Sequence, residues 1–223
     1  MDLGIGQPVP RIEDHRFIRG KGQFSDDLYF DGQAYAYVVR SPHAHAYIRE
    51  IDTRAAAAAP GVLAVLTAAE YLDDGLGPMP RSGNPLDALD PRKPALINRD
   101  GSMPFASSDL ALARDKVRHV GECVALVVAE TLNLAMDGAE LVAIDYEPIA
   151  AVTDVADAAR QGAPSVWDEA PNNIAVDCEW GDSAAVETAF AGAHHVVELN
   201  LRNNRVVNAQ MEPRAAVGEY NTI

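Results

Sequence analysis

The sequence predicts an α+β fold in which short strands and short helices follow one another along the chain. Residues 34–39 and 117–130 are rich in Val, Ala and Tyr, which is typical of strands, whereas residues 132–142 place apolar side chains at helical spacing. With 223 residues, of which 48% are hydrophobic, the chain is long enough for one large domain or two modest ones with a real core.

The individual elements are predicted by periodicity and by turn residues. A "DG" turn at Asp31 and Gly32 predicts a β-hairpin, in which residues 34–39 form the strand after the turn. Thr53 and Ser183 are in position to cap helices. Strands are expected at residues 34–39, 44–52, 62–66, 117–130, 144–149, 174–182 and 194–204, with two more strand-like pieces in 205–220. Helices are expected at residues 53–59, 67–72, 132–142 and 183–193.

Two stretches interrupt this order. Residues 73–108 are rich in Gly, Pro, Asp and Asn and predict a long irregular excursion. Residues 150–173 are rich in Ala, Pro and Asp and predict a linker with one short helix that wraps a surface. We therefore expect four parts. Residues 1–19 form an N-terminal arm, residues 20–149 a first domain, residues 150–173 the linker, and residues 174–223 an incomplete second domain.

Charge and cysteine content exclude several classes of function. The net charge of −15 and the pI near 4.6 oppose binding to nucleic acid or to an anionic membrane surface. The first residues lack the basic start and apolar core of a signal peptide, and no apolar run is long enough to cross a bilayer, so we expect a cytoplasmic protein. Cys123 and Cys178 are too few to ligate an iron–sulfur cluster, and free thiols are expected.

The residue groups that could carry chemistry include a histidine pair and a carboxylate. His43 and His45 would share one side of a strand and could form a metal-ligand pair, but the spacing supplies no third ligand, and two hydrogen-bonding histidines are the simpler interpretation. No metal site is predicted. Glu212 lies close in sequence to Arg205 and Arg214, and a structural ion pair is favoured over a catalytic base.

Four segments carry a family resemblance by their order and spacing. They begin "VPRIEDHRF", "VVRSPHAHAYIREID", "VRHVGECVALVVAE" and "NNRVVNAQMEPRAAVGEY", and they cover residues 9–28, 38–70, 117–154 and 203–220. This succession resembles the large subunit of the molybdenum hydroxylases, the family of xanthine dehydrogenase and aldehyde oxidase, and it is most similar to the aerobic carbon monoxide dehydrogenase branch.

The resemblance implies an architecture and a cofactor. Residues 20–149 would form an α/β hammerhead domain, and residues 174–223 would begin the first molybdopterin-binding domain. The complete enzyme would hold a molybdenum–pterin cofactor and pass electrons to companion subunits that carry iron–sulfur clusters and FAD. Gln210, displaced from the family's glutamine position, and Glu212 would lie near the cofactor. The catalytic glutamate is expected beyond these residues, so no catalytic residue is assigned, and no cofactor is expected on this chain alone.

The resulting functional hypothesis is a structural one. We expect the N-terminal portion of the large subunit of a molybdenum-dependent oxidoreductase, which hydroxylates aldehydes or N-heterocycles or oxidises carbon monoxide. These residues would contribute scaffold and subunit assembly, and the chain alone would be inactive. The alternative hypothesis is a non-catalytic interaction module that binds partner subunits through the hammerhead surface.

Overall fold

The computed structural model describes residues 5–6, 8–79, 96–204, 206–210, 212 and 214–220. The chain divides into two compact units. One unit is Ala34–Ala193, and the other combines Met1–Gln33 with His194–Ile223. Each unit is described by itself. No helix among the described residues is long and apolar enough to cross a membrane.

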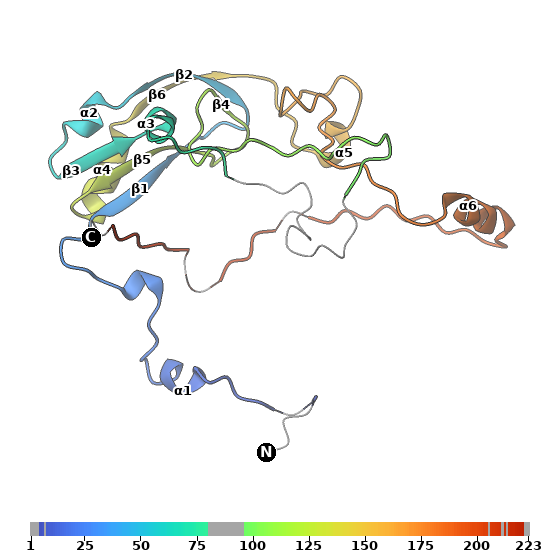
Figure 1. Cartoon of the computed structure of the whole chain (residues 1–223), viewed down its shortest axis with the longest axis horizontal. Helices are drawn as coiled ribbons and strands as arrows, with labels where there is room; N and C mark the ends of the chain where they lie inside the picture. Colours follow the sequence, from blue (N-terminus) through green and yellow to red (C-terminus); the bar gives the residue numbers. More distant parts are fainter. Residues whose placement is uncertain are drawn as a thin grey trace. The chain divides into compact units, whose positions relative to one another are not determined.

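The first sheet has an apolar central strand. β1 (Tyr35–Arg40), β5 (Cys123–Ala129) and β3 (Val62–Leu66) pair antiparallel in the order β1-β5-β3 (Figure 1). Four side chains of β5 are fully buried, namely Val124, Ala125, Val127 and Ala129. Burial of this strand on both faces explains why its sequence is a nearly continuous apolar run.

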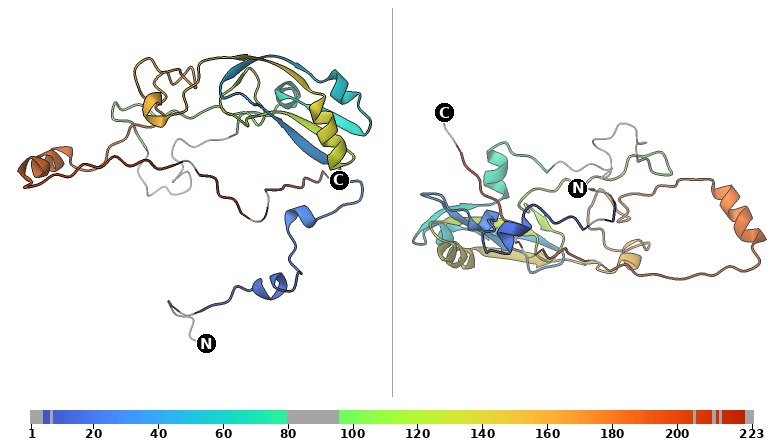
Figure 2. Two further views of the ribbon diagram at one scale, coloured as in Figure 1. Left: turned by 180° about the vertical axis from the view of Figure 1, so that it is seen from behind. Right: turned by 90° about the horizontal axis from the view of Figure 1, so that it is seen from below.

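Helix α4 (Leu132–Glu140) packs against all three strands of this sheet (Figures 1 and 2). The Thr131 hydroxyl caps the helix by accepting a hydrogen bond from Leu134 N at 3.3 Å. A Cβ atom at Gly138 would lie 2.9 Å from Val62 Cγ2 and 3.1 Å from a Val127 methyl. The helix therefore approaches the sheet as closely as it does because this position has no side chain.

Two short helices flank β3. α2 (Arg54–Ala57) begins after Thr53, whose side chain makes no capping bond; instead Asp52 Oδ1 accepts from Arg54 N at 3.0 Å. α3 (Ala68–Asp73) has a capping box, in which Thr67 accepts from Ala69 N and Glu70 accepts from Thr67 N at 2.7 Å. The Thr67 hydroxyl also donates to Glu70 Oε2, and this bond, followed by the backbone hydrogen bonds of Glu70 and Thr67, lowers the pKa of Glu70.

The second sheet places β2 (Ala46–Asp52) between β4 (Lys116–Val117) and β6 (Ala143–Pro148), all antiparallel. The main core is formed between the sheets, because Val124 of β5 belongs to the same apolar cluster as residues of β2 and β4. Its buried members are Ala46, Ala113, Val117 and Val124, with Ile48, Ile51, Ile144 and Tyr146 packed against them. The predicted strand at 117–130 is thus two strands in two sheets, separated by a turn at Gly121 with φ of 86°.

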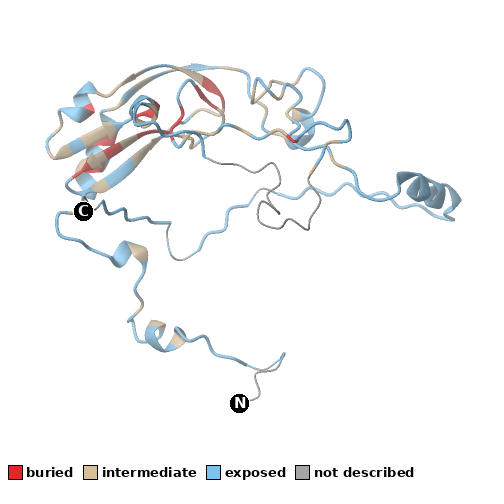
Figure 3. Ribbon diagram, in the orientation of Figure 1, coloured by how far each residue is buried: buried red, intermediate tan, exposed pale blue. Residues whose placement is uncertain are grey.

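The linker contains α5 (Val155–Ala158) and is stabilised by Asn173, whose side-chain amide donates to the carbonyl oxygens of Ala158 and Pro164 at 3.0 and 2.9 Å. Beyond it, α6 (Ser183–Gly192) is capped by Asp182, which accepts from Ala185 N, and the predicted cap at Ser183 is wrong. Every residue of α6 is exposed (Figure 3).

The other unit has little regular structure. α1 (Asp14–Phe17) and the 3-10 turn η1 (Ser25–Asp27) are its two elements in the described residues, and the Phe17 and Phe24 rings stack with centroids 5.6 Å apart. The predicted hairpin is wrong, because a 3-10 turn stands where its first strand was expected and β1 pairs with β5 instead. The strands predicted after residue 173 are absent from the described residues, because no neighbouring strand pairs with them.

Candidate functional site

One face of the second sheet carries a polar cluster. Tyr47 of β2 lies opposite Lys116 of β4 in the register, so their side chains share a face, and the Lys116 ammonium lies 5.0 Å from the Tyr47 ring centroid. The Lys116 side chain is only 8% exposed, and its Nζ donates to both carboxylate oxygens of Asp168 at 2.9 and 3.1 Å. A buried ammonium on the sheet is therefore paired with a carboxylate of the linker.

Arg118, which directly follows β4, and Trp167 of the linker form a second contact next to the Lys116–Asp168 pair. The Arg118 guanidinium carbon lies 3.8 Å from the Trp167 ring centroid, and Arg118 Nη1 donates to the Lys116 carbonyl oxygen at 3.2 Å. The Glu122 carboxylate accepts from Arg118 N. Trp167 also packs on Phe105 with ring centroids 5.9 Å apart. We call Trp167–Asp168 the linker clamp, because it holds the linker against this face.

The linker clamp has a defined charge state. The hydrogen bond from Lys116, followed by the charges of Lys116, Arg118 and His45, lowers the pKa of Asp168 below its ordinary value. The Asp168 side chain is 76% exposed, so water screens its interaction with Lys116 more than the burial of Lys116 alone suggests. The carboxylate is ionised at neutral pH, which matches the buried ammonium.

The two histidines have different partners. His45 is 6% exposed, and its Nδ1 lies 2.9 Å from the carbonyl oxygen of Ala150. Because a carbonyl only accepts, Nδ1 carries a proton, and Nε2 is buried without a hydrogen-bond partner among the described residues. The His43 ring instead lies 4.9 Å from the Tyr146 ring, and burial raises the pKa of Tyr146. The structure does not bring His43 and His45 to a common ligand position.

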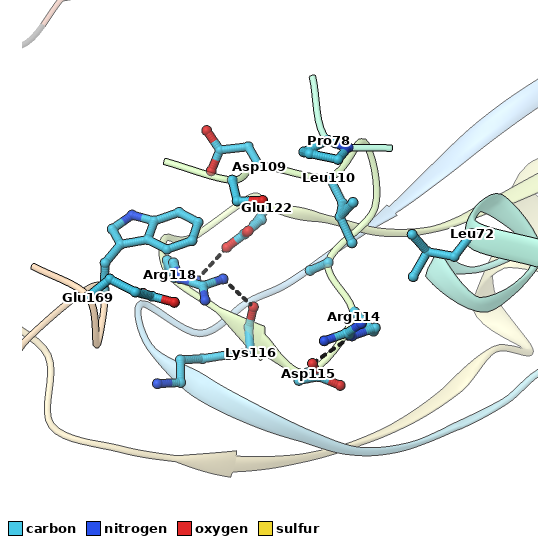
Figure 4. A pocket seen from close by; sticks show the side chains of 13 residues that line it. Leu72, Pro78, Asp109, Leu110, Arg114, Asp115, Lys116, Arg118, Glu122 and Glu169 are labelled. Carbon is cyan, nitrogen blue, oxygen red and sulfur yellow. Dashed lines mark hydrogen bonds and ion pairs between the residues drawn. The ribbon is translucent and has the colours of Figure 1, made fainter. Parts of the chain in front are cut away.

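A cavity of about 350 Å³ adjoins the linker clamp, which is within the size range of small-molecule sites (Figure 4). Leu72, Leu110 and Trp167 contribute apolar walls. Its charged lining residues are Asp109, Arg114, Asp115, Lys116, Arg118, Glu122 and Glu169.

Two of the basic residues that line this cavity are held in ion pairs. Arg114 pairs with Asp115 at 2.7 Å, Lys116 pairs with Asp168 of the clamp, and the Glu122 carboxylate accepts from the backbone N–H of Arg118 (Figure 4).

The residues expected near a cofactor lie in the other unit. Gln210 and Glu212 are both exposed, and Glu212 Oε1 accepts a long hydrogen bond from Ser25 N at 3.4 Å. Arg205 lies outside the described residues, and no ion pair joins Arg214 to Glu212 in the described part of the chain. Gln210 and Glu212 do not by themselves form a cradle for a molybdenum–pterin group, and their place near one stays a prediction.

Within the described ranges, no three His, Cys, Asp or Glu side chains gather as they would around a metal ion.

Sequence reasoning missed the linker clamp. A signal was present, because Lys116 stands beside a buried-strand residue in "DKVRHV" and Trp167–Asp168 is an aromatic–acid pair in an otherwise Ala- and Pro-rich stretch.

Comparison with known proteins assigns the chain to a family. The sequence profile described as "Aldehyde oxidase and xanthine dehydrogenase, a/b hammerhead domain" matches residues 19–89 and 92–150. The nicotine 6-hydroxylase large subunit of Paenarthrobacter nicotinovorans is 37% identical over 97% of this chain and 24% of its own length. The carbon monoxide dehydrogenase large chain of Afipia carboxidovorans is 32% identical over 99% of this chain and 26% of its own.

Solved structures agree with these relatives. The crystal structure of Cu,Mo-CO dehydrogenase in the carbon monoxide reduced state superposes with a TM-score of 0.66 and 33% identity, over 86% of this chain and 23% of that one. The chain thus spans about a quarter of the length of the large subunits that it matches. The profile match and the shared fold show that the chain belongs to the aldehyde oxidase and xanthine dehydrogenase family and carries its α/β hammerhead domain.

Proposed function

We propose that this chain supplies the N-terminal scaffold of the large subunit of a molybdenum-cofactor-dependent oxidoreductase. The observation that carries the proposal is the alignment of 97–99% of the chain with parts of large subunits, one from a nicotine hydroxylase and one from a carbon monoxide dehydrogenase. The reaction of the whole enzyme is proposed to be hydroxylation of an aldehyde or N-heterocycle, or oxidation of carbon monoxide.

The proposed domain division follows the predicted boundaries. It places the hammerhead domain at residues 20–149, the linker at 150–173 and the beginning of a molybdopterin-binding domain at 174–223. The profile match over residues 19–150 supports the first part. The linker clamp supports the second, because it fastens residues 167–168 to a finished sheet surface.

In this proposal the chain contributes assembly instead of chemistry. Two basic residues that line its cavity are held in ion pairs, Arg114 with Asp115 and Lys116 with Asp168 of the linker, which favours a structural role for that region. A molybdenum–pterin cofactor would be held by the complete enzyme, with Gln210 and Glu212 near it. The proposed partners are the rest of the large subunit and companion subunits with iron–sulfur clusters and FAD, and the proposed location is the cytoplasm.

Reconstitution tests the proposal. The chain would be co-expressed with the remaining large-subunit polypeptide and the iron–sulfur and flavin subunits of the same organism. We expect a complex that contains this chain and about one molybdenum per large subunit, no stoichiometric metal on the chain purified alone, and no active complex when the chain is omitted. A chain that carries molybdenum alone would contradict the scaffold role. A chain that binds companion subunits without the remaining large-subunit polypeptide would favour the interaction module.

A further inference from the structure

The chain contains four Asp–Gly pairs, in which the backbone nitrogen after the aspartate belongs to a residue without a side chain. The pairs are Asp31–Gly32, Asp74–Gly75, Asp100–Gly101 and Asp137–Gly138. In such a pair this nitrogen can approach the side-chain carboxyl carbon of the aspartate with little steric hindrance, because glycine has no Cβ. The folded chain decides which pairs can react, since it holds some of these groups in place and leaves others free.

Three of the four glycine N–H groups are held by backbone hydrogen bonds. Gly75 N donates to the Leu72 carbonyl oxygen at 2.9 Å, and Gly101 N donates to the Asn98 carbonyl oxygen at 2.8 Å. Gly138 lies inside α4, where the backbone hydrogen bonds of the helix use its N–H. An attack by any of these three nitrogens on the preceding side chain must first break such a bond.

Asp100 is restrained at its side chain as well. Its Oδ1 accepts a hydrogen bond from Ser102 N at 2.9 Å. Hydrogen bonds from Ser102, led by the one from its side chain, lower the pKa of the Asp100 carboxyl. Ring closure on this carboxyl must expel one of its oxygens, and a protonated carboxyl loses water more readily than a carboxylate loses oxide. The Ser102 bonds therefore disfavour reaction at Asp100 further.

The Asp31–Gly32 pair has none of these restraints. Both residues are exposed, and neither the Gly32 N–H nor the Asp31 carboxylate has a hydrogen-bond or ion-pair partner among the described residues. The pair forms the centre of a β-turn that is closed by Gln33 N, which donates to the Phe30 carbonyl oxygen at 3.0 Å, and Gly32 has a φ of 77°. The peptide between Asp31 and Gly32 can rotate while this bond stays intact, because type I and type II β-turns differ by the orientation of that peptide.

We propose that Asp31 is a site of spontaneous isoaspartate formation in the folded chain. The Gly32 nitrogen bonds to the side-chain carboxyl carbon of Asp31, and the carboxyl OH leaves with the N–H proton as water, which gives a five-membered succinimide ring. One water molecule from the solvent then opens the ring at either carbonyl carbon. Opening at the α-carbonyl leaves the main chain running through the Asp31 side chain, as isoaspartate, and the mass of the chain is unchanged.

The product differs from aspartate in its backbone and in its carboxylate. Isoaspartate adds one main-chain carbon to the turn, whereas β1 begins only at Tyr35, so the pairing of β1 with β5 should persist. The carboxylate of the product is attached to the α-carbon of residue 31. This is the group that isoaspartate-specific carboxyl methyltransferases accept, with S-adenosylmethionine as the methyl donor.

Ageing of the whole chain at neutral pH for several weeks tests the proposal. Peptide mapping with electron-transfer fragmentation would measure isoaspartate at each Asp–Gly pair, and a parallel sample in guanidinium chloride would report on the unfolded chain. In the folded chain we expect at least about threefold more isoaspartate at Asp31 than at any other pair, because its glycine N–H has no bond to break. In the unfolded chain the four amounts should be similar. Equal amounts at the four pairs of the folded chain, or a larger amount at Asp74, Asp100 or Asp137 than at Asp31, would overturn the proposal.

Two matched variants give an independent measurement. Asp31→Asn and Asp100→Asn reach the same type of ring by loss of ammonia, and its hydrolysis changes the mass that intact mass spectrometry records above the wild-type background. Asparagine at position 100 keeps an Oδ1 that can accept from Ser102 N, so the local restraint remains. We expect Asp31→Asn to deamidate at least about threefold faster than Asp100→Asn in the folded chain, and at a similar rate in guanidinium chloride. Equal rates in the folded chain would show that the structure does not select Asp31.

Discussion

Replacing Asp168 by alanine should destabilise the Ala34–Ala193 unit by about 1–2 kcal/mol. Breaking a fully buried ion pair costs about 3–5 kcal/mol, whereas an exposed pair is worth about 0.2–1 kcal/mol. The Lys116–Asp168 pair lies between these cases, because the Lys116 side chain is 8% exposed and that of Asp168 is 76% exposed. The substitution leaves a buried ammonium with the Tyr47 ring, 5.0 Å away, as its remaining described partner.

Lys116→Met supplies the second corner of a double-mutant cycle. Methionine keeps an unbranched stem against Tyr47 and removes the charge, while the exposed Asp168 carboxylate returns to water at little cost. We expect this variant to lose less than about 1 kcal/mol, and Asp168→Ala to cost almost nothing in its background, so that the coupling energy is about 1–2 kcal/mol. Urea unfolding followed by Trp167 fluorescence would measure all four proteins.

The stabilising effect of Asp168 should depend on pH in a direction that its pKa shift sets. The pKa of Asp168 is lowered in the folded chain, so its stabilising effect is present above the unfolded value of about 3.9 and is lost as the pH falls through the folded value. The difference between wild type and Asp168→Ala should therefore shrink below about pH 4. Glu169→Ala, which removes the neighbouring exposed carboxylate, is the control. An equal cost for Asp168→Ala with and without Lys116 would refute the reasoning.

Three further predictions concern separate positions. The Arg54 side chain lowers the pKa of Asp52 to about 2, so an NMR titration should place its midpoint near that pH and Arg54→Ala should move it toward about 3.9. Gly138→Ala should lower stability by about 0.5–2 kcal/mol in thermal unfolding, because overpacking against β3 and β5 outweighs the gain in helix propensity; a stabilised variant would contradict this. Cys123 and Cys178 are free, so mass spectrometry after alkylation without reductant should show both modified and no linked peptide.

Local signals in the sequence predicted the elements, but not all of their partners. The apolar run 123–129 and the helical spacing of 132–140 are visible in the sequence, and β5 and α4 occupy these positions. Their neighbours are set by distant pairing, as between Tyr37 and Val127, which no local pattern specifies. Gly121 explains one error, because its positive φ ends the predicted strand between two sheets.

The candidate site was harder to predict for the same reason. Lys116 and Asp168 are 52 residues apart, and His45 reaches Ala150 across 105 residues, so their contacts depend on the finished sheets. After residue 173 the alternating pattern was recognised, but alternation describes a side-chain surface and does not supply a pairing strand. Gln210 and Glu212 were placed by resemblance alone, and their proximity to a cofactor stays a prediction.

The interleaved order of the two sheets determines when this domain can fold during synthesis. In each sheet, at least one outer pairing joins segments far apart in the chain, and Tyr47 waits for Glu147, which is made 100 residues later. At about 5–20 residues per second, the ribosome needs about 5–20 s to supply that partner. β5 is complete only at Ala129 and β6 only at Pro148, so for most of this interval β1, β2 and β3 exist without these partners. Nascent chains that stop before Pro148 should therefore stay sensitive to protease and bound to chaperones, and protection should appear abruptly once β6 has emerged.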